Sequence, residues 1–170
     1  MRPLLFILTI TVICLSCKKD NIKAGETVEI YLLKTIQTVS GKCQINSSTS
    51  VLQETAIIKN QDILEYSQID YQFKLTDTAM QKVKTFKDFT PFAVTVDKQV
   101  IYYGFFKPSF SSSSCDNSIT MDIAWAPQGM VTNKISLKLG YPGALQGVTI
   151  DDQRNNTKLL ATLKKQGKLK

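Results

Sequence analysis

Few residues in this chain could do chemistry, and the most informative observation is a residue type that is missing. The 170 residues include no histidine, which excludes Ser-His and Cys-His catalysis, histidine-ligated zinc and histidine pH switches. Ser111 to Ser114 form a serine run, but a serine nucleophile needs a neighbouring base and a site for the oxyanion. We therefore predict no catalytic residue, no cofactor and no metal ligand.

A small hydrolase that works without histidine is the alternative interpretation. It would use a Ser-Lys pair, or two carboxylates that converge in a cleft, and the candidate carboxylates are Asp70, Asp97 and Asp122. Two carboxyl groups about 5 to 9 Å apart would suit a glycosidase-like reaction. The sequence alone brings none of these side chains together, so the non-catalytic interpretation comes first.

The N-terminal residues have the pattern of an export signal. Residues 4–15 form an uncharged, mostly apolar run that follows Arg2 and ends just before Ser16 and Cys17. A helix of this length covers about 18 Å, whereas the core of a bilayer is roughly 30 Å thick. A basic start, a short apolar run and a small residue at the boundary predict a secretory signal rather than a membrane span.

The boundary itself resembles a bacterial lipoprotein signal, in which a small residue precedes a cysteine that is diacylated and becomes the mature N-terminus. Ser16 matches the small residue and Cys17 the lipidated one. The resemblance implies three parts: a signal peptide over residues 1–16, a lipid-anchored tether over 17–26 and a single globular domain over 27–170. An ordinary cleaved signal and an uncleaved anchor are the alternatives.

The start of the mature chain, Cys17 to Asp20, is similar to that of lipoproteins from Bacteroidetes-type bacteria, and the whole chain resembles small uncharacterised members of that group. This resemblance implies a location in the cell envelope, at the outer membrane, on its periplasmic face or at the cell surface. It implies no activity.

Two further cysteines, Cys43 and Cys115, remain in the mature chain. An even pair in an oxidising compartment predicts a disulfide bond, which would stabilise the fold by about 4 kcal/mol. Two separate buried thiols are the alternative. A metal site would need further cysteine or histidine ligands that the mature chain does not contain.

Charge indicates which partners to expect. The formal net charge is +7, but the lysines are spread along the chain, except for those close to its C-terminus. A nucleic-acid site would need clustered positive charge, so we predict no nucleic-acid partner. The partners that we expect are the membrane, through the lipid anchor, and a protein or glycan of the cell envelope.

The elements that must position these residues form an α+β fold with a mostly antiparallel or mixed sheet. Alternating apolar residues predict strands over residues 27–34, 67–75, 92–96, 100–107, 118–125 and 134–139. Helical spacing predicts one helix that begins after Thr76 and a C-terminal helix that is capped by Asp151 or Asp152 and runs to about Gln166. Around the first helix we expect a ferredoxin-like strand–helix–strand–strand segment, in which a right-handed crossover makes the flanking strands parallel.

This segment also resembles the ferredoxin-like periplasmic head of SecD translocase subunits. Phe73 to Thr76, Ala79 and Val94 to Asp97 carry the resemblance. It covers only this segment and implies a local topology, without a role in translocation.

The densest aromatic cluster lies on the strand predicted over residues 100–107. Tyr102 and Phe106 share one face of that strand, Tyr103 and Phe105 share the other, and Phe110 follows in a loop. Large aromatic side chains are typical of binding surfaces, so Tyr102, Phe106 and Phe110 are the candidate partner-binding residues. The alternative is a central strand that is buried on both faces.

Overall fold

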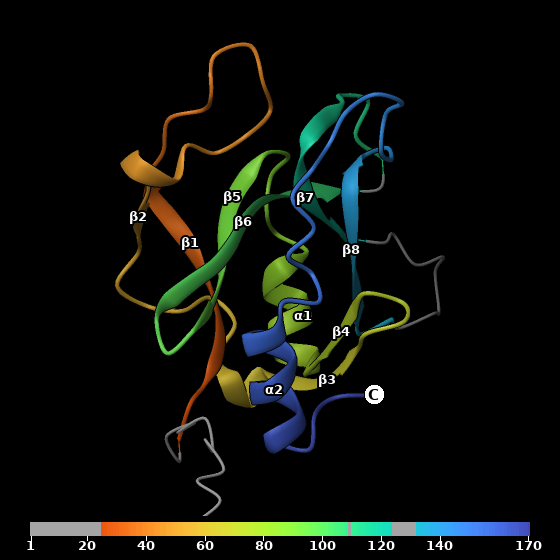
Figure 1. Cartoon of the computed structure of the whole chain (residues 1–170). Coiled ribbons are helices and arrows are strands. Elements are labelled where there is room, and N and C mark those ends of the chain that lie inside the picture. The colour runs from red at the N-terminus through yellow and green to blue at the C-terminus, as the bar shows by residue number, and fades with distance from the viewer. Residues whose placement is uncertain (1–24, 109, 124–131) are drawn as a thin grey trace, which may run out of the picture.

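The computed structural model describes residues 25–108, 110–123 and 132–170. In these residues it contains one sheet of eight strands, in the order β2-β1-β5-β6-β7-β8-β4-β3, and two α-helices (Figure 1). Neighbouring strands are antiparallel except β6 and β7, which are parallel. The predicted α+β class, with a mixed sheet and a C-terminal helix, is confirmed.

The strands are β1 (Val28–Thr35), β2 (Val51–Leu52), β3 (Ile63–Ser67), β4 (Gln72–Leu75), β5 (Thr90–Val96), β6 (Gln99–Pro108), β7 (Cys115–Ile123) and β8 (Lys134–Tyr141). The α-helices are α1 (Asp77–Val83) and α2 (Thr157–Lys165), and short 3-10 turns lie at Ser47–Thr49 and Asn60–Asp62.

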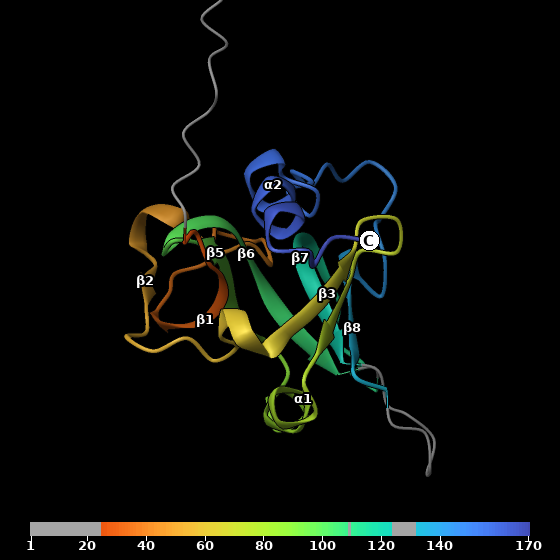
Figure 2. The ribbon, with the colours of Figure 1, turned by 90° about the horizontal axis from the view of Figure 1, so that it is seen from below.

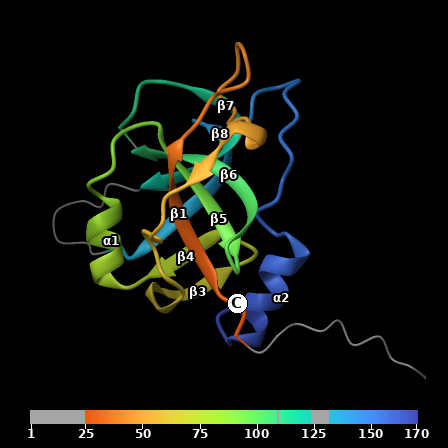
Figure 3. The same ribbon diagram turned by 90° about the vertical axis from the view of Figure 1, so that its left-hand side faces the viewer.

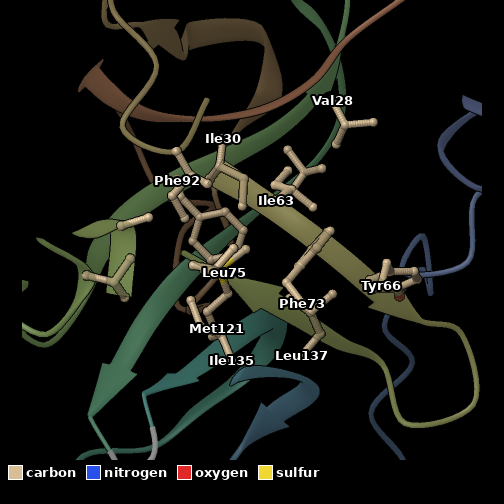
Figure 4. Packing of buried hydrophobic residues seen from close by; sticks show 14 of the residues in the cluster. Val28, Ile30, Ile63, Tyr66, Phe73, Leu75, Phe92, Met121, Ile135 and Leu137 are labelled. Carbon is tan, nitrogen blue, oxygen red and sulfur yellow. The ribbon is translucent and has the colours of Figure 1, made fainter. Parts of the chain in front are cut away.

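The sheet curves around a common interior, as Figure 2 shows from below. Every strand except β2 contributes buried apolar side chains to this main core, and Figure 4 shows ten of them with labels. The chain that leads into β3 lies against β1, where Ile58 forms a bridge with Ile30. The helices lie on opposite sides of the molecule in Figure 3, and both bury apolar residues in the same core, such as Met80 of α1 and Leu163 of α2.

A second, smaller core lies on the other face of β5 and β6. Its buried members include Leu33, Ala93, Phe105 and Tyr141. The chain between β1 and β2 covers it with Ile45, and a disulfide bond joins Cys43 in this segment to Cys115 at the start of β7, with the Cα atoms 5.1 Å apart. The predicted disulfide is therefore present, and it holds a long connection against the sheet.

Strong local patterns predicted their elements well. The alternation of Ile119, Met121 and Ile123 places all three in the main core from β7. The hydroxyl of Thr76 caps α1 by accepting a hydrogen bond from the backbone N–H of Ala79 at 3.3 Å, as expected for a residue with this role.

The single strand predicted over residues 67–75 is wrong. The structure forms a hairpin there, in which β3 and β4 are joined by a turn. The hydroxyl of Ser67 donates to the carboxylate of Asp70 at 2.8 Å, and Tyr71 takes a positive φ of 52°. The apolar alternation continues through this turn by coincidence, because Ile69 is 81% exposed instead of buried.

The parallel crossover around α1 is also wrong. The order of strand, helix, strand and strand is present as β4, α1, β5 and β6, but β4 and β5 are separated in the sheet by β6, β7 and β8. Successive pairings from β5 to β4 make these two strands antiparallel. The parallel pair is β6 and β7, which a connection without a helix joins.

Two smaller features also differ from expectation. The strands predicted over residues 92–96 and 100–107 leave a three-residue loop, but the β5–β6 hairpin has a two-residue turn, Asp97 and Lys98, because Val96 already pairs with Gln99. The C-terminal helix is capped by Asn156, whose side chain accepts from the backbone N–H groups of Lys158 and Leu159, and not by Asp151 or Asp152. Asp152 instead forms a salt bridge with Arg154 at 2.7 Å.

Candidate functional site

The structure buries two of the three predicted partner-binding residues. Tyr102 is 4% exposed and Phe106 is fully buried, and both rings pack against Phe92 in the main core. The prediction of an exposed aromatic face is therefore wrong for these two residues. The main core covers the face of β6 that carries Tyr102 and Phe106, and the second core covers the other face, where Phe105 is buried.

Phe110 remains exposed, at 77%. It lines a hollow of about 450 Å³ together with Phe86, Lys87, Asp88, Pro108, Ser111 and Ser112. The other predicted site residue, Cys17, lies outside the described residues, as does most of the predicted tether.

Beside this hollow lies a polar cluster that the structure builds from Asp88, Lys107, Ser111 and Ser113, which we call the Lys107 cluster. Lys107 is fully buried at the end of β6, and its Nζ lies 2.7 Å from Oδ1 of Asp88. The same Nζ donates to the hydroxyls of Ser111 at 3.1 Å and Ser113 at 3.0 Å. Both hydroxyls in turn donate to Oδ2 of Asp88, at 2.5 and 2.6 Å.

Asp88 and Lys107 form a salt bridge in which the carboxylate also accepts hydrogen bonds from both serines. Burial on its own raises the pKa of Asp88, but hydrogen bonds from Lys107, Ser111 and Ser113 outweigh it and hold the pKa below the ordinary value. The Nζ of Lys107 also lies 3.8 Å from the centre of the Phe89 ring, which adds a cation–π contact. Phe89 holds this position with a positive φ of 59°.

In this cluster every N–H donor of the Lys107 ammonium is matched by an acceptor. A lysine ammonium has three N–H donors, and the three acceptors from Asp88, Ser111 and Ser113 match them. A lysine that acts as a general base needs a free lone pair instead. The contacts therefore indicate a structural role, in which the cluster ties the chain after α1 and the loop before β7 to the end of β6.

The three carboxylates considered for a hydrolase lie in separate environments. Asp70 bonds to Ser67 in the β3–β4 turn, and Asp97 accepts from the backbone N–H of Thr27 at 2.9 Å. Asp122 lies on β7 and forms a salt bridge with Lys138. Each carboxylate thus has its own local partner.

A second, more polar hollow opens beside the first half of β6, and we call it the β6–β7 groove. Its volume is about 460 Å³. Its lining comes from four parts of the chain: Gln44, Ile45 and Ser47; Val100 to Tyr103; Asn117 to Ile119; and Thr149, Ile150, Asp151 and Gln153.

Separate elements hold the walls of the groove in place. The chain at residues 44–47 forms one wall next to the disulfide, and the hydroxyl of Ser118 donates to the backbone carbonyl of Cys43 at 2.6 Å. The opposite wall belongs to the connection between β8 and α2, which descends in front of β6 and β7 in Figure 1. Asp151 is the one charged side chain of the lining, and its carboxylate accepts from the side chain of Gln153 at 2.8 Å.

Other kinds of site are not found in the part of the chain that the structure describes. Those residues contain no group of three or more Cys, Asp or Glu side chains that could hold a metal ion. Neither α1 nor α2 is long and apolar enough to cross a membrane. Comparison with family models, with curated proteins and with solved structures finds no match.

Sequence reasoning missed both the Lys107 cluster and the groove. The sequence contains an indication of the cluster, because Lys107 follows directly on an apolar run and lies four residues before Ser111. It contains no comparable indication of the groove. Its lining combines segments that are more than a hundred residues apart, such as Gln44 and Gln153, and only the folded chain brings them together.

Proposed function

We propose that this protein is a non-catalytic lipoprotein of the cell envelope that binds a protein or glycan partner in the β6–β7 groove. The observation that supports this proposal is the groove itself, in which amide, hydroxyl and tyrosine side chains surround half-buried apolar residues. A few polar groups among apolar ones are typical of ligand sites.

The charge of the groove supports this choice of partner. The chain has a formal net charge of +7, yet the residues that line the groove include no lysine or arginine. A polyanion such as nucleic acid would be bound by clustered cations. A neutral partner therefore suits the groove better.

Lipid attachment at Cys17 belongs to the same proposal. The resemblance of Ser16 and Cys17 to a lipoprotein signal supports it, and several acyl chains together anchor a protein stably. Mass spectrometry of the mature N-terminus should find an acylated Cys17. The Cys17→Ala variant should be absent from the membrane fraction, or should retain its uncleaved signal peptide. An unmodified N-terminus in the wild-type protein would contradict the proposed lipid anchor.

A hydrolase with a Ser-Lys pair is the second candidate, because Lys107 does lie within hydrogen-bonding distance of two serines. The salt bridge to Asp88 weighs against it, since the nearest partner of the lysine Nζ is a carboxylate oxygen at 2.7 Å and not a serine hydroxyl. The non-catalytic function is therefore the better supported one.

Photo-crosslinking in cells tests the binding function. A photo-crosslinking amino acid replaces Gln44 or Thr149, which are exposed on opposite walls of the groove, and in the control it replaces Gln81, which is exposed on α1. We expect the same adduct from both groove positions and none from Gln81. If the groove positions give no adduct, or the same one as Gln81, the groove does not bind a partner.

A further inference from the structure

The first half of β6 has a strand partner on one side only. Its pairing with β5 runs from Gln99 to Phe106, whereas its pairing with β7 begins at Gly104. Among the described residues, no strand or backbone hydrogen bond outside the sheet ladders covers the other edge over residues 99–103. An inner strand of the sheet therefore presents an open edge for about half of its length.

The open edge exists because β7 diverges from β6 before residue 119. The pairing of β7 with β8 shifts register between Cys115 and Ile119. Cys115 is bonded to Cys43, and the hydroxyl of Ser118 donates to the carbonyl of the same Cys43. These contacts hold the first half of β7 close to the chain before β2, and the β6–β7 groove lies where the two strands separate.

A strand edge specifies its ligand more narrowly than a patch of side chains does. Its N–H and C=O groups alternate along the strand and match the backbone of another extended segment. Val100, Ile101 and Tyr103 are half-buried around this edge. The register shift at Ile101 sets that residue against the main core, while Val100 and Tyr103 lie against the second core. They can therefore contact side chains on both faces of an added strand. A glycan lacks the regular spacing of amides that such an edge favours.

We propose that the partner is a protein that inserts an extended peptide segment into the β6–β7 groove, where it adds as a strand to residues 99–103 of β6. This inference rests on the proposed function and specifies its ligand class. The segment is neutral or weakly basic, since Asp151 is the charged residue of the lining.

Peptides selected from a random library test the inference. The full chain, purified in mild detergent with its disulfide intact, is panned against phage-displayed dodecapeptides. An enriched peptide is then synthesised unmodified and with single N-methyl groups moved along its backbone, and binding is measured by fluorescence anisotropy. N-methylation removes one backbone donor and leaves the side chains unchanged.

We expect N-methyl groups at alternate positions to weaken binding by about tenfold or more, as the loss of a hydrogen bond would, with little effect at the positions between. Gln44→Arg should weaken binding, because it narrows the groove and repels basic peptides, while the matched Gln81→Arg on α1 should not. Three results would each overturn strand addition. In the first, N-methyl groups have the same small effect at every position; in the second, Gln44→Arg does not change peptide binding; in the third, the library yields no binding peptide.

These failures are distinguishable from failure of the proposed function. A glycan adduct at Gln44 and Thr149 in the crosslinking experiment would leave the binding function standing and overturn the peptide. Absence of any groove adduct would overturn the binding function itself.

Discussion

At the scale of single residues, two buried tyrosines of the main core differ in one respect. The hydroxyl of Tyr66 donates to the carbonyl of Arg154 at 2.8 Å and lies 3.2 Å from Oδ1 of Asn155. The hydroxyl of Tyr102 has no hydrogen-bond partner among the described residues. Burial raises the pKa of both phenols, so both hydroxyls stay protonated at neutral pH.

Replacing each tyrosine with phenylalanine should separate these two environments. Tyr66→Phe leaves a buried carbonyl without its donor and should lower the free energy of unfolding by about 1 kcal/mol. Tyr102→Phe removes an unpaired buried hydroxyl and should leave stability unchanged or raise it. Urea denaturation of the two variants measures the difference, and an equal loss in both would contradict the assigned contacts.

The Lys107 cluster predicts a dependence of stability on acid. The pKa of Asp88 is lower in the folded protein than the value of about 3.9 for an unfolded aspartate. The unfolded state then binds more protons, so the stabilisation by Asp88 is complete above about pH 5 and is lost as the pH falls through the folded pKa.

Asp88→Asn should therefore be less stable than the wild type at pH 6, and it should lose less of its remaining stability between pH 5 and pH 3. Thermal unfolding at several pH values measures both effects. Glu54→Gln, an exposed substitution outside the cluster, should keep the wild-type slope. An Asp88→Asn variant with that same slope would show that Asp88 does not contribute to the acid response.

At the scale of elements, the turn between β5 and β6 is built from residues that do not favour its geometry. Asp97 and Lys98 have φ values of 49° and 62°, and two positive values in a two-residue loop are typical of a turn in which glycine is preferred at the second position. Asp97 has a separate role, because its carboxylate accepts from the backbone N–H of Thr27. Lys98 is exposed.

Lys98→Gly should consequently stabilise the protein, by about 1 kcal/mol, because glycine adopts a positive φ without strain. The midpoint of thermal unfolding measures this gain. Gln99→Gly is the matched control: it places glycine at the first residue of β6 and removes a side chain that accepts a hydrogen bond from Lys158 at 2.7 Å, so it should destabilise. A lower midpoint for Lys98→Gly than for the wild type would contradict the assigned turn.

Elements were predictable wherever one local signal decided them. Alternation identified β7 and β8, and Thr76 marked the start of α1. The prediction failed at Ile69, because alternation continues through a turn that Ser67 and Asp70 form. It failed at the second helix because Asp151, Asp152 and Asn156 are all capable caps, and packing of Leu159 and Leu163 selects the last one. The parallel pairing of β6 with β7 depends on distant contacts that no local pattern encodes.

At the scale of the whole molecule, the C-terminal residues protect one edge of the sheet. β3 is the last strand on its side, but the backbone N–H of Tyr66 donates to the carbonyl of Lys168 at 2.7 Å, and that of Lys170 donates to the carbonyl of Tyr66 at 2.9 Å. Uncovered strand edges promote association between molecules. The short segment after α2 therefore acts as a cover for β3.

Ending the chain at Gly167 should expose this edge, lower stability and increase self-association. Light scattering as a function of concentration measures the association. Lys170→Ala keeps the backbone contacts and should behave as the unaltered chain does. If the shortened chain scatters no more than Lys170→Ala, the tail does not protect β3.

The strand order also sets when this fold can form during synthesis. β1 pairs with β5 along most of its length, from Val28 with Val96 to Leu32 with Phe92, and β4 pairs with β8 across a similar distance in sequence. A ribosome must therefore produce more than half of the polypeptide before its earliest strand meets its main neighbour. Until β5 has been synthesised, the apolar side chains of β1 lack their main neighbouring strand. Pairings between strands so distant in sequence slow folding. The fold therefore forms late, after most of its partner strands have been synthesised.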